Sequence, residues 1–250
     1  MRMKQFVYET HLHTCEGSAC GVTPGADYIE AYSKAGYAGI IVTDHFFNGN
    51  CRVDRSLSWE EKVNLYCLGY EHALERARLW NEAHGTDFKV FFGIEYNYDC
   101  DEYLIYGIDK AYLLAHPEIM EWSHDELFRQ MDAAGFLMVQ AHPFRKRGYI
   151  KEIHLHPECV HAVEAYNANN QPEENPQAFE YAKEHGLPVT SGTDMHHFGP
   201  QLMEFGGMAF DKPLETVFDY VKAVKDAGKA LKADASAGLT SGYEALHTGC

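Results

Sequence analysis

The sequence predicts an α/β fold built from parallel strands. Short apolar runs alternate with amphipathic segments along the chain, which is typical of strand–helix–strand units with parallel pairing. The chain has 250 residues, 46% of them hydrophobic, which is enough for one large core. About seven of the runs have the length of a strand, which fits a closed or nearly closed barrel. An open doubly wound sheet is the alternative. Because α/β barrels of this size are usually one domain, we expect a single domain over residues 1–250.

The first part of the chain predicts two strands with a helix between them. The apolar run 5–13 ("QFVYETHLH") predicts a buried strand. In 23–36, Thr23 is suited to cap a helix, Pro24 to occupy its first position, and a glycine to end it. The run 37–45 ("YAGIIVTDH") predicts the next strand.

The middle of the chain predicts a long helix, two strands and a shorter helix. The amphipathic segment 58–85 ends in glycine and predicts the long helix. The runs 88–98 ("FKVFFGIEYNY") and 103–108 ("YLIYGI") predict strands. A helix over 123–135 begins with Ser123 and a glutamate three residues later, the pattern of a capping box.

The remaining elements continue the alternation. Strands are predicted over 136–143, 159–167 and 187–194, with a helix over 175–186 and a final helix over 213–231. We expect residues 201–250 to contribute a strand and a helix that complete the barrel.

Composition limits the class of partner. Lys and Arg number 21 and Asp and Glu 37, so the formal charge is −16. Such an acidic surface repels polyanions and argues against duplex nucleic acid as a substrate. A small phosphorylated molecule is compatible with it, because bound cations can invert the local field.

The sequence predicts a cytoplasmic protein without a membrane span. No apolar run approaches the roughly 20 residues that a span requires. The N-terminus lacks the charged and apolar segments of a signal peptide. The seven cysteines are odd in number and include no CxxC pair, which indicates free thiols in such a chain.

Metal-binding residue types recur where the predicted strands end. The first strand ends in His11 and His13, the second in Asp44 and His45, and the third in Glu95. Later strands end in His142 and in Asp194, which His196 follows. In a parallel barrel these ends share one face, where active sites lie. Five separate strands therefore bring such side chains to one end of the barrel.

Each of these residues also has an ordinary structural interpretation. His11 and His13 point to the same side of a strand and need either hydrogen-bond partners or a cation between them. Asp44 and His45 could cap a helix, and Glu95 could form a salt bridge across the barrel. A metal centre accounts for all of them together. Its predicted ligands are His11, His13, His45, Glu95, His142, Asp194 and His196.

Seven donors exceed the four that one Zn²⁺ usually takes, so two or three ions are expected to share a bridging carboxylate. Mixed imidazole and carboxylate ligands favour Zn²⁺, Mn²⁺ or Fe²⁺ and argue against Ca²⁺.

The motifs "THLHT", "VTDH", "GIE", "AHPFR" and "GTDMH" occur in this order between about residues 6 and 200. The set resembles the motifs of the PHP (polymerase and histidinol phosphatase) family. The resemblance implies a metal-dependent phosphoesterase on a distorted (β/α)7 TIM-like barrel with a trinuclear metal site.

The resemblance also implies how the ligands are shared. His11, His13, Glu95 and Asp194 would hold the first metal. Glu95 would bridge to a second metal, which His142 also binds. The third metal would be held by His45 and His196.

The chain departs from the family pattern at two positions. Where the family often has an acidic residue or a histidine shortly after the HxH motif, "CEGSACG" offers Glu16 or Cys20. Cys20 could equally be a core thiol. Where the family usually has another ligand for the second metal, "DCDEYLIYG" offers Asp101 or Glu102.

Arg145 lies three residues after His142 and could hold a phosphate oxygen with its guanidinium. It could instead be a surface arginine of the basic stretch that continues with Lys146 and Arg147. That stretch is the one concentration of positive charge in an acidic sequence, which favours a role in attracting an anion.

The predicted function is hydrolysis of a small phosphomonoester by a hydroxide that bridges two metals, as in a histidinol phosphatase. Nothing in the sequence selects histidinol phosphate itself. Three alternatives stay open: a phosphodiesterase or 3′–5′ exonuclease on short nucleotides, a metal-binding regulatory module without catalysis, and a metal-dependent C–N hydrolase. No lysine lies at a strand end to bridge two metals by carboxylation, as some enzymes of the last class require.

Overall fold

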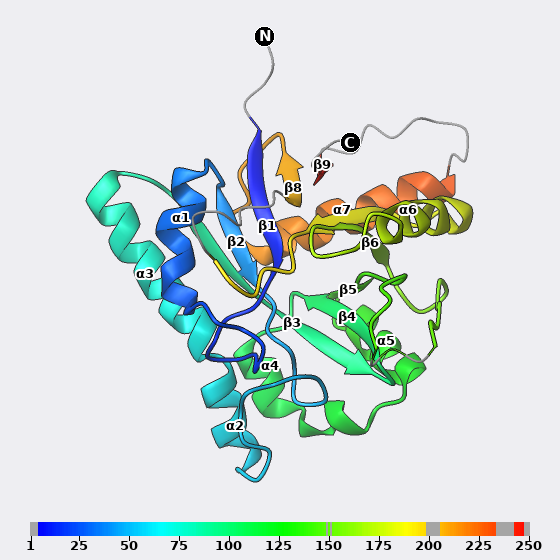
Figure 1. Cartoon of the computed structure of the whole chain (residues 1–250), viewed down its shortest axis with the longest axis horizontal. Coiled ribbons are helices and arrows are strands. Elements are labelled where there is room, and N and C mark those ends of the chain that lie inside the picture. Colours follow the sequence, from blue (N-terminus) through cyan, green and yellow to red (C-terminus); the bar gives the residue numbers. More distant parts are fainter. Residues whose placement is uncertain (1–4, 149, 151, 199–205, 234–242, 248–250) are drawn as a thin grey trace.

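The computed structural model describes residues 5–148, 150, 152–198, 206–233 and 243–247. Within them, one sheet has the strand order β7-β6-β5-β4-β3-β2-β1-β8-β9 (Figure 1). The sheet curls until β7 meets β1. The Thr10 hydroxyl donates to the carbonyl oxygen of Ser191 (2.7 Å), and Leu12 forms a parallel bridge with Met195. The predicted α/β class and nearly closed, TIM-like barrel are therefore confirmed.

The strands are β1 (Phe6–Leu12), β2 (Gly39–Val42), β3 (Lys89–Tyr98), β4 (Asp101–Tyr106), β5 (Leu137–Gln140), β6 (Ala162–Asn167), β7 (Val189–Gly192), β8 (Gly206–Phe210) and β9 (Tyr243–His247). The helices are α1 (Tyr28–Lys34), α2 (Trp59–Tyr66), α3 (Leu68–His84), α4 (Lys110–Ala115), α5 (His124–Ala133), α6 (Glu174–His185) and α7 (Val217–Ala233), with 3-10 turns over Gly25–Asp27 and Pro117–Glu121.

Most strands run in one direction. β1, β2 and β3 pair in parallel, and so do β5, β6 and β7. β4 is antiparallel to both β3 and β5, which makes those two parallel to each other. The carboxyl ends of β1, β2, β3, β5, β6 and β7 therefore lie at one end of the barrel, which we call the rim.

The predicted strand over 103–108 is β4, but parallel pairing was the wrong expectation for it. No helix separates it from β3. The two strands are joined by a tight turn at Asp99 and Cys100, both of which have positive φ (52° and 73°). A connection this short allows only antiparallel pairing. As a result β4 begins at the rim, whereas its neighbours end there.

Two helix predictions need correction. The segment 58–85 forms two helices, α2 and α3, that meet at Cys67. The helix expected from Thr23 begins instead with a 3-10 turn at Gly25. Thr23 does not cap it, because its hydroxyl accepts a hydrogen bond from the backbone N–H of Phe198 (2.8 Å).

The C-terminal segment adds two strands, β8 and β9, to the seven that were predicted. β8 pairs antiparallel with β1, β9 pairs with β8, and α7 lies between them in the chain. One strand and one helix were expected of 201–250, and the described part of that segment contains two strands and one helix. Positions 201–205, 234–242 and 248–250 of that segment lie outside the described residues.

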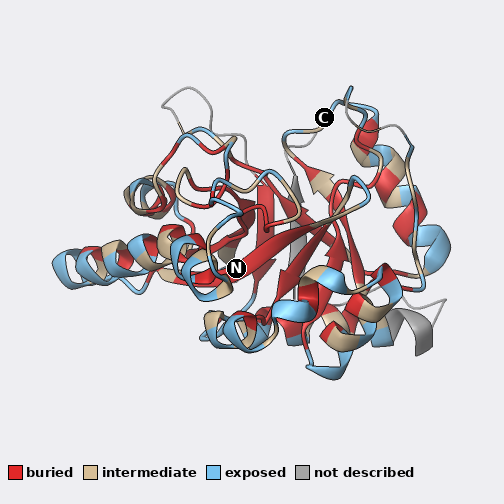
Figure 2. Ribbon diagram, turned by 90° about the horizontal axis from the view of Figure 1, so that it is seen from below, coloured by how far each residue is buried: buried red, intermediate tan, exposed pale blue. Residues whose placement is uncertain are grey.

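The strands form the buried centre of the molecule and the helices cover it, with exposed residues on their outer faces (Figure 2). Every residue of β2 is buried, as the unbroken apolar run "GIIV" predicts for a strand covered on both faces. Among the described residues, no helix has the length and apolar character required to cross a membrane.

Candidate metal centre

The seven predicted ligands gather at the rim. His11 lies in β1, with His13 just beyond its end, and Glu95 lies in β3. The other four follow strand ends: His45 after β2, His142 after β5, and Asp194 and His196 after β7. Three triads of donor atoms close enough to share a cation are His11–His13–Asp194, His11–Glu95–His142 and His13–His45–His196. Six of the seven residues are buried, and His196 is half-buried.

Glu95 lies at the centre of the group. One carboxylate oxygen, Oε1, is 3.2 Å from Nε2 of His11 and 3.2 Å from Nε2 of His142. The other, Oε2, is 2.7 Å from Nδ1 of His45 and 3.4 Å from Nε2 of His13. Burial favours the neutral acid, but the imidazoles of His45 and His11 hold the pKa of Glu95 well below its usual range. Glu95 is thus an anion with imidazoles around both of its oxygens.

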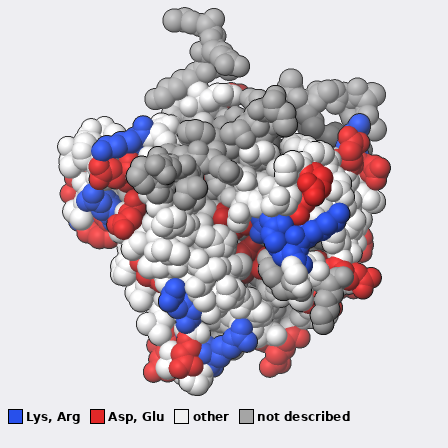
Figure 3. Space-filling model, in the orientation of Figure 1, with Lys and Arg blue, Asp and Glu red and all other residues white. Residues whose placement is uncertain are grey.

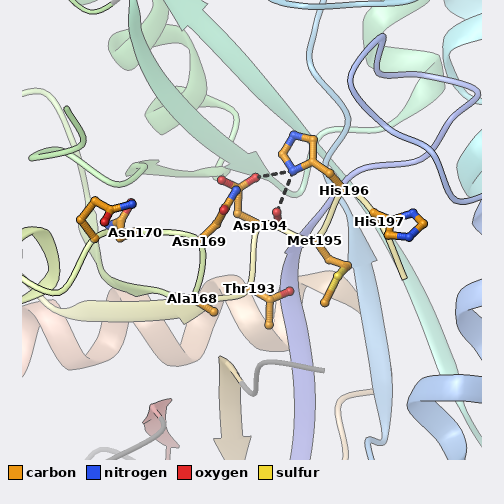
Figure 4. A pocket seen from close by; sticks show the side chains of 9 residues that line it. Ala168, Asn169, Asn170, Thr193, Asp194, Met195, His196 and His197 are labelled. Carbon is orange, nitrogen blue, oxygen red and sulfur yellow. Dashed lines mark hydrogen bonds and ion pairs between the residues drawn. The ribbon is translucent and has the colours of Figure 1, made fainter. Parts of the chain in front are cut away.

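Hydrogen bonds orient three of the imidazoles. The Nδ1–H of His11 donates to Oε1 of Glu164 (2.9 Å). His13 Nδ1 lies 3.0 Å from the Ser18 hydroxyl, which itself donates to Asp44, so the histidine is the donor. His196 Nδ1 donates to the backbone oxygen of Asp194 (2.7 Å; Figure 4). With Nδ1 occupied in this way, each ring would present its Nε2 lone pair to a bound metal, as metal-binding histidines do.

These lone pairs meet at short distances. Nε2 of His11 and Nε2 of His13 are 3.2 Å apart, and Oδ1 of Asp194 lies 3.0 Å from the second and 3.4 Å from the first. Atoms of this kind repel each other at such distances unless a proton or a metal cation lies among them.

Several buried atoms at the rim also lack a hydrogen-bond partner among the residues that the structure describes. They include His45 Nδ1 and Glu95 Oε2, which lie 2.7 Å apart without the alignment of a hydrogen bond. A buried polar group without a partner costs about 1–3 kcal/mol. Oriented lone pairs, unpaired oxygens and a mixed imidazole and carboxylate donor set fit divalent cations at the rim.

The backbone is strained at two of the predicted ligands. His142 and Asp194 have φ values of 28° and 56°. The left-handed region is uncommon for residues with a side chain, and a following proline, such as Pro143, disfavours helical conformations further. Such strain is typically found at functional sites, where the surrounding structure enforces it.

The structure separates Glu102 from Asp101. Glu102 begins β4 at the rim, where its oxygens lie 3.5 Å from Nδ1 of His45 and 3.4 Å from Nε2 of His142. Asp101 points to the opposite face of the strand and accepts a hydrogen bond from Nδ1 of His154 (2.8 Å). Of the two, Glu102 is the one that faces the predicted ligands, where it forms a further group of ligand atoms with His45 and Glu95 that are close enough to share a cation.

Of Cys20 and Glu16, only Cys20 lies beside the predicted ligands. The Cys20 thiol lies within hydrogen-bonding reach of His45 and His196; burial raises its pKa, but these two imidazoles outweigh that and lower it to about 6. Glu16 lies away from the rim centre, where it bonds Nδ1 of His72 (3.0 Å) and the backbone of Gly25. Cys20 therefore lies where a thiolate could reach the predicted ligands, whereas the Glu16 carboxylate contacts His72 and Gly25 instead.

Arg145 is not a surface residue. It is 6% exposed, and Nη1 forms an ion pair with Oδ2 of Asp194 (2.7 Å). Nε and Nη2 donate to the side-chain oxygens of Asn170 (3.0 Å) and Asn167 (2.9 Å). The guanidinium is thus fixed behind a predicted ligand, and its charge faces the rim. Contact with a phosphate stays a prediction.

Glu164 and Glu9 are two buried carboxylates at the site that the sequence analysis missed. Glu164 orients His11, accepts from the backbone N–H of His142 (3.2 Å) and lies in β6. Glu9 accepts from the backbone N–H groups of His11 (2.8 Å) and Thr193 (3.0 Å), so it joins β1 to the segment after β7. Burial raises the pKa of Glu9 to about 7. A feature of the sequence could have identified both residues, because each is a glutamate within an apolar strand, as Glu95 is.

Replacing Glu164 with glutamine should weaken metal binding or turnover about 10- to 100-fold, the usual cost of losing a carboxylate that orients a histidine ligand. Glutamine keeps the size of the side chain but makes a weaker acceptor for His11 Nδ1–H. Isothermal titration with Mn²⁺ and a rate assay would measure the effect. Glu158→Gln, an exposed change before β6, is the control. An unchanged affinity and rate would contradict this role.

A cavity of about 390 Å³ opens beside Asp194 and His196 and is lined by the segments 168–171 and 193–197. Asn169 and Asn170 lie on the side facing Asp194, while His197 is turned away from it (Figure 4). Figure 3 shows a group of Lys and Arg side chains beside a hollow in which acidic atoms are visible. The space suits a small polar molecule next to the predicted ligands.

Metal addition should stabilise the protein. Four or more buried acceptor groups converge at the rim, so cations should bind the folded chain far better than the unfolded one. At a free metal concentration of one hundred times Kd, one site adds about 2.7 kcal/mol to the unfolding free energy. Urea unfolding of chelator-treated protein with and without Mn²⁺ measures this, with NaCl of equal ionic strength as the control. Equal stability under all conditions would exclude a metal centre.

Two solved structures share the fold. One is a two-domain protein from Bacteroides vulgatus that contains a PHP-like metal-dependent phosphoesterase, with a TM-score of 0.59 and 13% identity over 90% of this chain. The other is a metal-dependent phosphoesterase from Bifidobacterium adolescentis, with a TM-score of 0.52 and 15% identity over 88% of this chain. In both names the activity is itself a prediction.

The match covers 64% of the Bacteroides chain and 96% of the Bifidobacterium chain, so this chain spans less than two thirds of the first. An amidohydrolase from Chromobacterium violaceum superposes with a TM-score of 0.47, which is too low to support an argument. The sequence matches no family model, and no curated protein is significantly similar to it. The fold expected from the resemblance to the PHP family is therefore confirmed, and at these identities the comparisons show the fold alone.

Proposed function

We propose that this protein is a metal-dependent phosphoesterase that hydrolyses a small phosphomonoester. One observation carries the proposal. Each carboxylate oxygen of Glu95 lies within 3.5 Å of two imidazoles, so that four rings surround this one side chain at the rim of the barrel. The names of the two structural neighbours support the same class of reaction. Histidinol phosphate is one substrate to test among others.

The residues would divide the cations among them as follows. His11, His13, Glu95 and Asp194 would hold the first, and Glu95, His142 and Glu102 the second. His45 and His196, with Cys20 beside them, would hold the third. Two or three ions of Zn²⁺, Mn²⁺ or Fe²⁺ suit these donors. When bound, such ions lower the pKa of water and neutralise phosphoryl oxygens.

The remaining residues orient the ligands and supply charge. Glu164 and Ser18 hold the rings of His11 and His13 so that both lone pairs face the rim centre. Arg145 places a fixed positive charge behind Asp194, and three of its five N–H donors are used by the contacts described. The other two can donate to a phosphate oxygen.

The cavity and the charge favour a small substrate. A cavity of about 390 Å³ beside Asp194 holds a small molecule, and the net charge of −16 disfavours duplex nucleic acid. We further propose that residues 1–250 act as one domain in the cytoplasm. The single-domain proposal rests on the length of the sequence, which suits one large core.

The test is phosphate release from a panel of small phosphomonoesters after reconstitution with Zn²⁺, Mn²⁺ or Fe²⁺. We expect turnover of at least one monoester, and none after chelation. Dinucleotides and short oligonucleotides serve as comparison substrates. Release of mononucleotides without any monoester activity would favour the phosphodiesterase alternative. Full metal loading without turnover on any ester would contradict the proposal and favour a non-catalytic metal-binding module.

A further inference from the structure

A second group of metal-binding side chains lies away from the rim. His124 and Asp125 begin α5, and Cys159 lies in the segment that leads into β6. One ligand atom from each residue lies within 4.8 Å of the others. The Cys159 sulfur is 3.4 Å from Oδ1 of Asp125, which lies 4.0 Å from Nδ1 of His124. None of these residues contacts the metal centre described above.

His124 is the unusual member of this group. It is 5% exposed, and neither ring nitrogen has a hydrogen-bond partner among the described residues. Aromatic rings surround it, with ring centroids at 4.6 Å for Tyr103, 5.7 Å for Tyr98 and 4.4 Å for His156. A buried imidazole with two unpaired nitrogens costs free energy unless something binds it.

We propose that His124, Asp125 and Cys159 bind one zinc ion. Sulfur, imidazole and carboxylate are the three donor types that Zn²⁺ takes in proteins, and thiolate excludes the hard cations Mg²⁺ and Ca²⁺. Three protein ligands leave the fourth tetrahedral position to water. Asp125 is largely exposed, so an ion can reach the group from solvent.

Zinc binding at this group would require only the loss of one proton. The Cys159 thiol loses its proton to solvent as the sulfur–zinc bond forms, and nothing is oxidised or reduced. Neither ring nitrogen of His124 is used by a hydrogen bond within the described part of the chain, so a neutral ring can donate its lone pair to the ion. The bound ion would join the start of α5 to the chain entering β6.

The decisive measurement is zinc content per chain after reconstitution and removal of free metal. Cys159→Ala and His124→Phe should each hold one zinc fewer than the wild type. Phenylalanine keeps a ring among Tyr98 and Tyr103 but offers no ligand. Cys100→Ala, which removes an exposed thiol, should match the wild type. Equal zinc in the wild type and both site variants would overturn the proposal and leave water as the occupant.

Binding of Co²⁺ provides a second test that does not depend on the number of metal ions per chain. Thiolate bound to Co²⁺ gives a charge-transfer absorption in the near ultraviolet. Because Cys20 lies in the rim centre, the comparison is made in a Cys20→Ser background. That protein should show the absorption, and adding Cys159→Ala should remove it. Absence of the absorption in Cys20→Ser, or its persistence in the double variant, would refute the site. Neither measurement depends on phosphoesterase activity, so the two proposals can fail separately.

Discussion

Replacement of His13 by alanine should lower the metal content of the rim centre by up to two ions and abolish turnover. His13 Nε2 lies 3.2 Å from Nε2 of His11 and 3.0 Å from Oδ1 of Asp194, and His13 also belongs to the triad with His45 and His196. One substitution therefore removes a donor from two candidate metal positions. We expect turnover to fall about a thousand-fold or more, equivalent to roughly 4 kcal/mol of transition-state stabilisation.

Metal analysis and phosphate release measure the two effects on the same preparation. His72→Ala is the matched control, since His72 is exposed on α3 and bonds Glu16 outside the centre. Circular dichroism shows whether each variant is folded. If His13→Ala retained the metal content and rate of the wild type, the assignment of the rim as the metal centre would be wrong.

Replacement of Arg145 by methionine should cost about 3–5 kcal/mol of unfolding free energy in the metal-free protein. This is the usual cost of removing one partner from a buried ion pair, because the remaining charge is left uncompensated. Here the remaining charge is Asp194, whose Oδ2 lies 2.7 Å from Nη1. Bound cations would supply part of the missing charge. The loss should therefore be smaller in the metal-loaded protein.

Urea unfolding of both forms tests this prediction. Arg145→Lys keeps the charge but not the planar fork that reaches Asp194 and both asparagines, so it should cause an intermediate loss. Arg78→Met is the control, because Arg78 is exposed on α3 and its solvent-screened pairs with Glu75 and Glu82 should contribute little to stability. An equal loss with and without metal would argue against Asp194 as a metal ligand.

Much of the architecture was predictable from local pattern. Apolar runs of strand length located seven strands correctly, and the period of two placed His11 and His13 on one face. A parallel barrel brings strand ends together wherever they occur in the sequence, so the shared rim followed from the alternation of strands and helices. The misplaced helix start at Thr23 and the break at Cys67 are differences of local geometry that do not move the site.

The sequence by itself determined which residue types stand at the strand ends, and hence the barrel and its predicted donors. Only the tertiary structure showed that Glu102, and not Asp101, faces the predicted ligands: the antiparallel direction of β4 brings both residues to the rim, and their side chains point to opposite faces of the strand. It also showed that Arg145 is buried against Asp194 and that Glu164 orients His11. The physical reason is that periodicity and strand ends are local properties of the chain. The ion pairs and hydrogen bonds between these side chains depend on closure of the barrel. Closure brings together segments that are more than 150 residues apart in the sequence.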